Sequence, residues 1–230
     1  MTFMHTRLEV LMMGTFVALT AFAMAAPLAE AQGTQAPVTL LSPDSMWKQK
    51  HNLRVCADPE NLPFSNKNRE GFDNKIADLI AKDLGDTVSY AWWPSRRGYV
   101  RNTLSAGACD VVIGIPVGFD LVATSKPYYR STYYIVTRTD KHLDIATLDD
   151  PRLKTLRIGV NLIGEDYTNT PPAHALSAHG VVGRNVVGFS GFYDEEHQPG
   201  EIIDSLAKGS IDVALVWGPL AGYFAKRAPS

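Results

Sequence analysis

The chain reads Gly107-Ala108-Cys109-Asp110-Val111-Val112-Ile113-Gly114-Ile115-Pro116 in its first half, and its second half contains a similar run, Gly209-Ser210-Ile211-Asp212-Val213-Ala214-Leu215-Val216-Trp217-Gly218-Pro219. The glycines that open these runs are 102 positions apart. Leu53-Arg54-Val55 and Leu156-Arg157-Ile158 form a second pair, 103 positions apart. Because two unrelated segment types recur at nearly one spacing, the sequence predicts two lobes of similar construction.

Each half alternates apolar strands with helical patterns. In the first half Ile76, Leu79, Ile80 and Leu84 form one apolar helical face, which we expect to start at an Asp73 cap and to end at a left-handed Gly85. Further helices are predicted over residues 98–105, 171–179 and 200–207. One strand is predicted to begin at residue 53, and the others are predicted over residues 88–92, 111–115, 156–160, 185–189 and 211–216. This alternation predicts an α/β fold with a parallel-dominated sheet in each lobe.

Residues 127–137 are rich in tyrosine and β-branched residues, which is typical of an extended segment that crosses between two lobes. We therefore expect a hinge here and a binding cleft between the lobes, at the carboxyl ends of the strands. The predicted organisation is a targeting segment (1–31), a flexible N-terminal segment (32–50), a first lobe (51–136) and a second lobe (137–230).

The N-terminus has the features of a secretory signal peptide. A basic start at Arg7 precedes an apolar run over residues 10–26, and Ala-x-Ala cleavage sites occur at 23–25 and 29–31. An uncleaved membrane anchor is the alternative, although a run of 17 residues is short for a span of ~20. We expect export to the periplasm without membrane insertion after cleavage. The net charge of −1 left after removal of residues 1–31 argues against a nucleic-acid partner.

Cys56 and Cys109 are the two cysteines of the chain. An even number of cysteines in an oxidising compartment favours a disulfide, and both lie on segments expected to become neighbouring strands. A pair of buried thiols is the alternative.

Candidate cleft residues follow the predicted strands or lie in the hinge. They are Asp58, Asn61, Phe64, Trp93, Arg97, Phe119, Asp120, Tyr129, Arg130, Asn161, Glu165 and Trp217. The alternatives are turn formation for the loop over residues 58–66, packing for the hinge tyrosines and solvent exposure for residues 161–166, and Trp217 is the strongest candidate of the second lobe. The histidines lack metal-ligand spacing, and the sequence contains neither a nucleophile elbow nor a glycine-rich phosphate loop. We therefore expect no metal, no cofactor and no enzymatic activity.

Residues 53–228 resemble extracellular solute-binding proteins of family 3, which implies a two-lobed periplasmic binding protein fold of type II. The resemblance rests on Leu53-Arg54-Val55-Cys56-Ala57-Asp58, Leu62-Pro63-Phe64-Ser65, Gly71-Phe72-Asp73, Leu104-x-x-Gly107-x-x-Asp110-Val111-Val112-Ile113-Gly114 and Pro127-Tyr128-Tyr129.

The chain departs from this family in three respects. Amino-acid binders carry Thr-x-x-Arg after the Ile-Gly strand, whereas residues 116–122 contain no arginine. Trp217 stands where those proteins place an aspartate for the ligand's ammonium group. The resemblance therefore implies that standard amino acids do not bind. The family also returns to the first lobe after the second, so we expect a truncated member that lacks this C-terminal return.

A narrower resemblance is to the MoxJ/XoxJ-type branch, which is found with PQQ-dependent methanol dehydrogenases. It rests on Cys56-Ala57-Asp58-Pro59, Trp92-Trp93-Pro94, Arg96-Arg97-Gly98, Arg101-Asn102-Thr103-Leu104, Cys109-Asp110-Val111-Val112, Tyr128-Tyr129-Arg130-Ser131, Trp217-Gly218-Pro219 and Ala221-Gly222-Tyr223-Phe224-Ala225. The implied role is an accessory factor that assists maturation or activation of the dehydrogenase by binding it through the cleft. The alternative is the substrate-binding component of an ABC transporter, which would deliver a small polar solute other than a standard amino acid to its permease.

Overall fold

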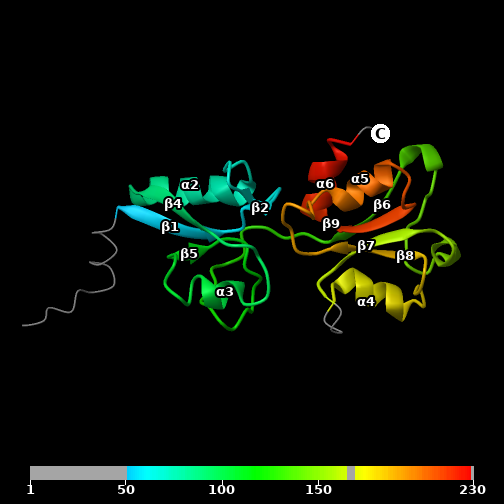
Figure 1. Cartoon of the computed structure of the whole chain (residues 1–230), viewed down its shortest axis with the longest axis horizontal. Helices are drawn as coiled ribbons and strands as arrows, with labels where there is room; N and C mark the ends of the chain where they lie inside the picture. Colours follow the sequence, from blue (N-terminus) through cyan, green and yellow to red (C-terminus); the bar gives the residue numbers. More distant parts are fainter. Residues whose placement is uncertain (1–50, 165–168, 229–230) are drawn as a thin grey trace, which may run out of the picture. The chain divides into compact units, whose positions relative to one another are not determined.

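The computed structural model of the chain describes residues 51–164 and 169–228 (Figure 1). The expected signal peptide, the segment over residues 32–50 and the candidate residue Glu165 lie outside the described residues. No helix in the described ranges is both long enough and apolar enough to cross a membrane.

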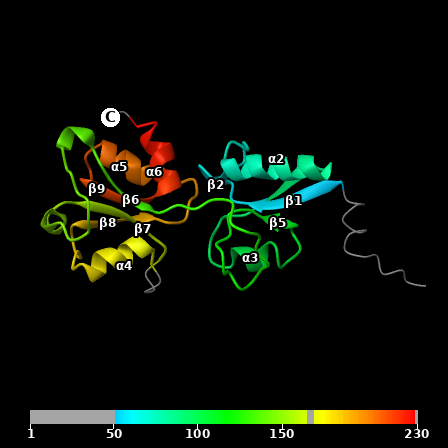
Figure 2. The same cartoon turned by 180° about the vertical axis from the view of Figure 1, so that it is seen from behind.

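The first half of the chain forms a three-stranded parallel sheet in the order β4-β1-β5. Its elements are β1 (Asn52–Ala57), β4 (Thr87–Trp92), β5 (Val111–Val112), α2 (Phe72–Leu84), the short α3 (Tyr99–Asn102) and a small ribbon of β2 (Glu60–Asn61) and β3 (Ser65–Asn66). Helix α2 lies along one face of this sheet in both views (Figures 1 and 2). Leu53 and Val55 from β1 pack there against Ala77 and Ala81 from the helix.

The second half forms a four-stranded sheet in the order β6-β9-β7-β8, in which only β6 is antiparallel to its neighbour. Its elements are β6 (Tyr133–Thr137), β7 (Ile158–Leu162), β8 (Val186–Ser190), β9 (Val213–Trp217), α4 (Pro171–Ala178), α5 (Glu201–Ala207), α6 (Gly218–Ala225) and the 3₁₀ turns η1 (Thr139–Lys141) and η2 (Pro151–Lys154). Figure 1 shows α4 on one face and α5 with α6 on the other. Each face has its own apolar cluster, around Leu176 and around Leu206 respectively.

The parallel-rich α/β prediction is therefore confirmed, and most predicted elements begin and end within about two residues of the observed ones. Two elements are shorter than predicted. The strand expected over residues 111–115 pairs only at Val111–Val112, and the helix expected over 98–105 is the single turn Tyr99–Asn102. A glycine in the left-handed conformation at position 114 (φ 87°) turns the chain directly after β5.

The predictions of which residues cap helix α2 and which of its faces packs on the sheet are wrong in part. Gly71 is the N-cap residue and Asp73 lies in the first turn, whereas Gly85 ends the helix in the left-handed conformation as predicted (φ 72°). Leu79 is 65% exposed, and Ile80 and Leu84 are also exposed. Small side chains face the sheet instead: Ala77 is fully buried and Ala81 nearly so. Alanine lets the helix backbone approach the strands closely, so the larger residues beside it point outward.

Strand β6 spans the predicted boundary between the two lobes at residue 136. It pairs with β9 along its whole length, from Tyr133 opposite Trp217 to Thr137 opposite Val213. The second sheet therefore begins at Tyr133, within the segment expected to be the hinge. The division into two lobes stays a prediction.

The internal repeat extends to individual hydrogen bonds. In the first sheet the backbone N–H of Arg54 donates to the Asp110 carboxylate, and the Arg54 guanidinium donates to the Gly107 carbonyl. Arg157 makes the same two contacts in the second sheet, with Asp212 and Gly209. Strands β1 and β5 thus correspond to β7 and β9.

A disulfide joins Cys56 on β1 to Cys109, which lies just before β5, and the two Cα atoms are 5.4 Å apart. Both cysteines are buried. The predicted bridge is confirmed, and the alternative of two buried thiols is wrong.

Candidate binding pocket

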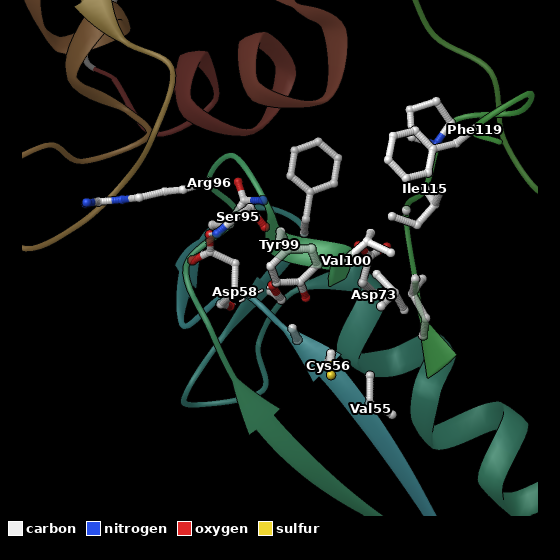
Figure 3. Close-up of a pocket in the computed structure, with 18 of the residues that line it drawn as sticks. Val55, Cys56, Asp58, Asp73, Ser95, Arg96, Tyr99, Val100, Ile115 and Phe119 are labelled. Carbon is white, nitrogen blue, oxygen red and sulfur yellow. Dashed lines mark hydrogen bonds between the residues drawn. The ribbon is translucent and has the colours of Figure 1, made fainter. Parts of the chain in front are cut away.

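A cavity of about 700 Å³ lies where β1 and β5 end and α2 begins (Figure 3). Its walls come from the end of β1, the start of α2, the loop that leads into α3 and the segment that follows β5. Trp217, at the end of β9, also lines it. This is the carboxyl edge of a parallel sheet, where the sequence predicts the site.

Asp58 is held rigidly at one side of this cavity. It is 4% exposed, and its two carboxylate oxygens accept hydrogen bonds from the backbone N–H groups of Glu60 (2.9 Å) and Ser95 (2.6 Å). Figure 3 shows Asp58 and Ser95 next to each other at the cavity wall. These bonds tie the end of β1 to the loop after β4, so the carboxylate shapes the site whether or not it contacts a ligand.

Asp73 is a second buried carboxylate in the wall. Its side chain accepts a hydrogen bond of 3.0 Å from the Tyr128 hydroxyl, and no cation is paired with it in the described ranges. Burial raises the pKa of Asp73 to about 6, and the hydrogen bond from Tyr128 opposes this shift in part. Asp73 is therefore a carboxylate that ionises only near neutral pH.

Asn74 follows Asp73 and is almost fully buried. Its carbonyl oxygen accepts from the backbone N–H groups of Asn66 and Gly71, both at 3.2 Å, which closes the start of α2. Its Nδ2 has no hydrogen-bond partner in the part of the chain that the structure describes.

Tyr99 lies between the two carboxylates (Figure 3). Burial, followed by the negative charges of Asp58 and Asp73, raises the pKa of its hydroxyl. Tyr99 therefore stays protonated and can donate a hydrogen bond to an acceptor in the cavity.

Aromatic rings continue from this wall toward the second sheet. The ring of Phe72 contacts those of Phe64 and Tyr129, with centroid distances of 5.1 and 5.8 Å. Tyr129 and Trp217 both line the cavity. Trp217 also packs against Tyr133 at 5.1 Å. The lining thus combines an aromatic surface with a few polar groups, which is typical of binding sites.

A smaller cavity of about 310 Å³ shares much of this wall. Asp58, Phe64 and Trp217 line both cavities, and Asn161 and Tyr193 line the smaller one. Asn161 is oriented by a hydrogen bond from its Nδ2 to the Ser190 carbonyl (3.0 Å). At the rim, Arg96 forms an ion pair with Asp194 (2.6 Å).

The structure brings most of the candidate residues together. Those that line the larger cavity are Asp58, Asn61, Phe64, Arg97, Phe119, Tyr129 and Trp217. Asn161 lines the smaller cavity, and Arg130 lines a groove beside β5 that shares Tyr129 and Trp217 with the larger cavity. Trp93 and Asp120 line none of the described cavities. The binding role of these residues stays a prediction.

Sequence reasoning missed Asp73, Asn74 and Tyr99. The sequence predicts Asp73 as a helix cap, and it predicts the helix around Tyr99 over residues 98–105 without singling out Tyr99 for the site. The sequence does contain one signal for this site, the run Gly71-Phe72-Asp73-Asn74. This run starts the helix that packs on β1, so it brings polar side chains close to the carboxyl end of that strand. The described residues contain no group of three or more histidine, cysteine or acidic side chains that could hold a metal ion.

Comparison with known proteins identifies relatives that match most of the chain, although no family model matches it. Protein MoxJ from Methylorubrum extorquens is 32% identical in an alignment 222 residues long, and the match covers 88% of this chain and 68% of the relative. Protein MoxJ from Paracoccus denitrificans is 30% identical in an alignment 188 residues long, and the match covers 76% of this chain and 65% of the relative. The chain thus spans about two thirds of the length of these relatives.

Among solved structures, the periplasmic binding protein XoxJ from Methylobacterium extorquens AM1 is 40% identical and has a TM-score of 0.61. The match covers 76% of this chain and 72% of XoxJ. The chain belongs to the MoxJ- and XoxJ-type family of periplasmic solute-binding proteins.

Proposed function

We propose that this protein is a non-enzymatic periplasmic accessory factor that binds a segment of a PQQ-dependent methanol dehydrogenase in the cavity between β1, α2 and Trp217. Binding there would assist maturation or activation of the dehydrogenase. The observation that carries the proposal is the aromatic character of the cavity wall: Phe64 and Tyr129 both contact the ring of Phe72, and Trp217 lines the same cavity. Membership of the MoxJ- and XoxJ-type family supports it.

The chemistry of the wall suits a polypeptide ligand. Large aromatic side chains dominate the energetics of protein-binding hot spots, because they bury much apolar area and lose little conformational freedom. Tyr99 can donate a hydrogen bond to a peptide carbonyl, and the ionised Asp73 can accept one from a peptide N–H group or a basic side chain. The larger cavity admits a few residues of extended chain rather than a folded domain.

A small solute delivered to an ABC permease is the second candidate. The cavity volume of about 700 Å³ favours it, since small-molecule sites commonly measure roughly 300–1,000 Å³. The solute would be a polar molecule other than a standard amino acid.

Free amino acids are not expected to bind at all. Ile115, Pro116, Phe119 and Leu121 line the cavity after β5, so this segment offers no arginine for bidentate contact with an α-carboxylate. Calorimetric titration with the standard amino acids should show no saturable heat at millimolar concentration. A micromolar dissociation constant for any of them would contradict this interpretation and favour the transport role.

Replacement of Trp217 by alanine is expected to weaken the complex with the dehydrogenase at least tenfold, which corresponds to about 1.4 kcal/mol. The substitution removes an aromatic ring that lines the cavity and packs against Tyr133. Trp93→Ala is the matched control, because Trp93 is exposed and lines none of the described cavities. Surface plasmon resonance with immobilised dehydrogenase would measure both affinities.

Cross-linking of the complex tests the location independently. We expect cross-links from the dehydrogenase to lysine and acidic residues around the cavity mouth, such as Glu60 and Lys67. An unchanged affinity for Trp217→Ala, together with cross-links confined to α4 and α5, would place the partner elsewhere and leave the cavity to a solute.

A further inference from the structure

The segment over residues 95–101, the arginine loop, leads from β4 into α3 and supplies all the cations that line the larger cavity in the described part of the chain. Arg96, Arg97 and Arg101 are exposed, and each of them lines that cavity. The two carboxylates among the lining residues, Asp58 and Asp73, are instead buried in its wall. The charges of the cavity are thus separated by depth, with the cations at the rim.

The backbone of the arginine loop is held in place by hydrogen bonds. The backbone N–H of Ser95 donates to the Asp58 carboxylate (2.6 Å), and that of Tyr99 donates to the Arg96 carbonyl (2.9 Å). Gly98 has the left-handed conformation (φ 86°), which turns the chain just before α3. The loop therefore keeps its shape without a ligand. Binding has to order only the arginine side chains, which limits its entropic cost.

Arg96 shows that this loop can hold a carboxylate. Its guanidinium forms the ion pair with Asp194, which lies in the loop between β8 and α5. Asp194 follows Phe192 and Tyr193, and both of these aromatic residues line the smaller cavity. The chain's own Phe-Tyr-Asp run thus places two aromatic residues beside a carboxylate that the arginine loop holds.

An anion in the larger cavity meets cations on one side only. Figure 3 shows Ile115 and Phe119 on the side opposite Ser95 and Arg96, and the side chains of Ile115 and Phe119 carry no charge. Arg101 forms no ion pair with another residue of the described ranges. An anion is therefore expected to lie at the arginine loop, away from the buried carboxylates.

We propose that the segment bound in the larger cavity carries an aspartate or glutamate beside its aromatic or apolar residues, and that Arg101 holds this acidic side chain at the rim. The proposal rests on the proposed function, since it names the chemistry of the segment that binds there. Arg97, on the same loop, adds positive potential. A guanidinium can hold a carboxylate through two parallel hydrogen bonds. A free amino acid does not satisfy this site, because the ammonium group beside its carboxylate would face the same cations.

Two short peptides with blocked ends probe this site in the intact protein, acetyl-Phe-Tyr-Asp-amide and acetyl-Phe-Tyr-Asn-amide. They differ only in the charge of the last side chain, and protein tryptophan fluorescence follows their binding. We expect the aspartate peptide to bind about fivefold more tightly, which is the upper end of what one exposed ion pair contributes. Raising the NaCl concentration from about 20 mM to about 300 mM should remove most of this preference, because salt screens charges at the rim.

Substitutions in the loop assign the preference to the arginines. Arg97→Gln with Arg101→Gln should bind both peptides equally, whereas Arg97→Lys with Arg101→Lys should keep part of the preference, because lysine retains the charge but not the two parallel hydrogen bonds. The matched control is Lys154→Gln with Arg184→Gln, which removes two exposed cations that line none of the described cavities and should leave the preference unchanged. An unchanged urea midpoint of each variant shows that the fold is intact.

Three outcomes would overturn the proposal: no saturable binding of either peptide, equal affinities of the wild type for both, or a preference that survives the double glutamine substitution. The dehydrogenase is measured separately, and its affinity should fall about fivefold in the same variant. An arginine-dependent preference for the aspartate peptide, together with no measurable complex with the dehydrogenase, would support the acidic-segment site and reject the dehydrogenase as its partner.

Discussion

Replacing Cys56 and Cys109 together by alanine is expected to lower the free energy of unfolding by about 4 kcal/mol, because the bridge closes a loop across 53 positions. In the chain-entropy model, a link of this span strongly restricts the unfolded chain. The loop that the bridge closes contains β2, β3, α2, β4 and α3, and the bridge itself ties the end of β1 to the segment just before β5. A loss of 4 kcal/mol is a large share of the 5–15 kcal/mol typical of folded domains. The variant should therefore be unfolded at a much lower urea concentration.

Urea denaturation followed by circular dichroism measures this effect. Wild-type protein treated with a reducing agent is the control, because it keeps both sulfur atoms in place and loses only the link. Equal losses in the variant and in the reduced protein would assign the effect to the link rather than to packing. A loss below about 1 kcal/mol in both would contradict the prediction.

The elements that the sequence predicted well are those whose signal is local or repeated. The apolar strands around Val55, Ile158 and Val213 stand out because both their faces are buried, so almost every residue in them is apolar. The repeat then pairs them across the two halves. The bridge between Cys56 and Cys109 could be predicted because parallel neighbours bring the two segments together.

The elements predicted badly depend on packing that the sequence does not encode locally. Helical periodicity identifies an apolar face on α2, yet Ala77 and Ala81 rather than Leu79 and Leu84 face the sheet. Periodicity alone cannot rank a face of large residues against one of small residues, because closeness of approach depends on the strands beneath. For the same reason Asp73 could be interpreted as a cap, although its carboxylate lies in a cavity wall.

The second large expected effect is the pH dependence of the free energy of unfolding that the buried Asp73 carboxyl causes. Burial raises the pKa of this carboxyl to about 6, from an ordinary value of 3.8. A carboxyl whose pKa is raised by folding keeps its proton more tightly in the folded state. Its contribution to stability is therefore fully present below about pH 4 and is lost as the pH rises through about 6. The shift corresponds to about 3 kcal/mol at neutral pH.

Asp73→Asn should therefore stabilise the protein at pH 7.5 by about 2 kcal/mol, since the favourable position of a negative charge in the first turn of α2 offsets part of the gain. The asparagine oxygen can still accept the hydrogen bond from Tyr128. At pH 4 the variant and the wild type should differ little, because both side chains are then uncharged. Urea denaturation at the two pH values measures the difference, with Asp83→Asn on the exposed side of the same helix as the control. A gain of the same size at pH 4 and pH 7.5 would show that the effect arises from packing, and that the buried charge of Asp73 carries no cost.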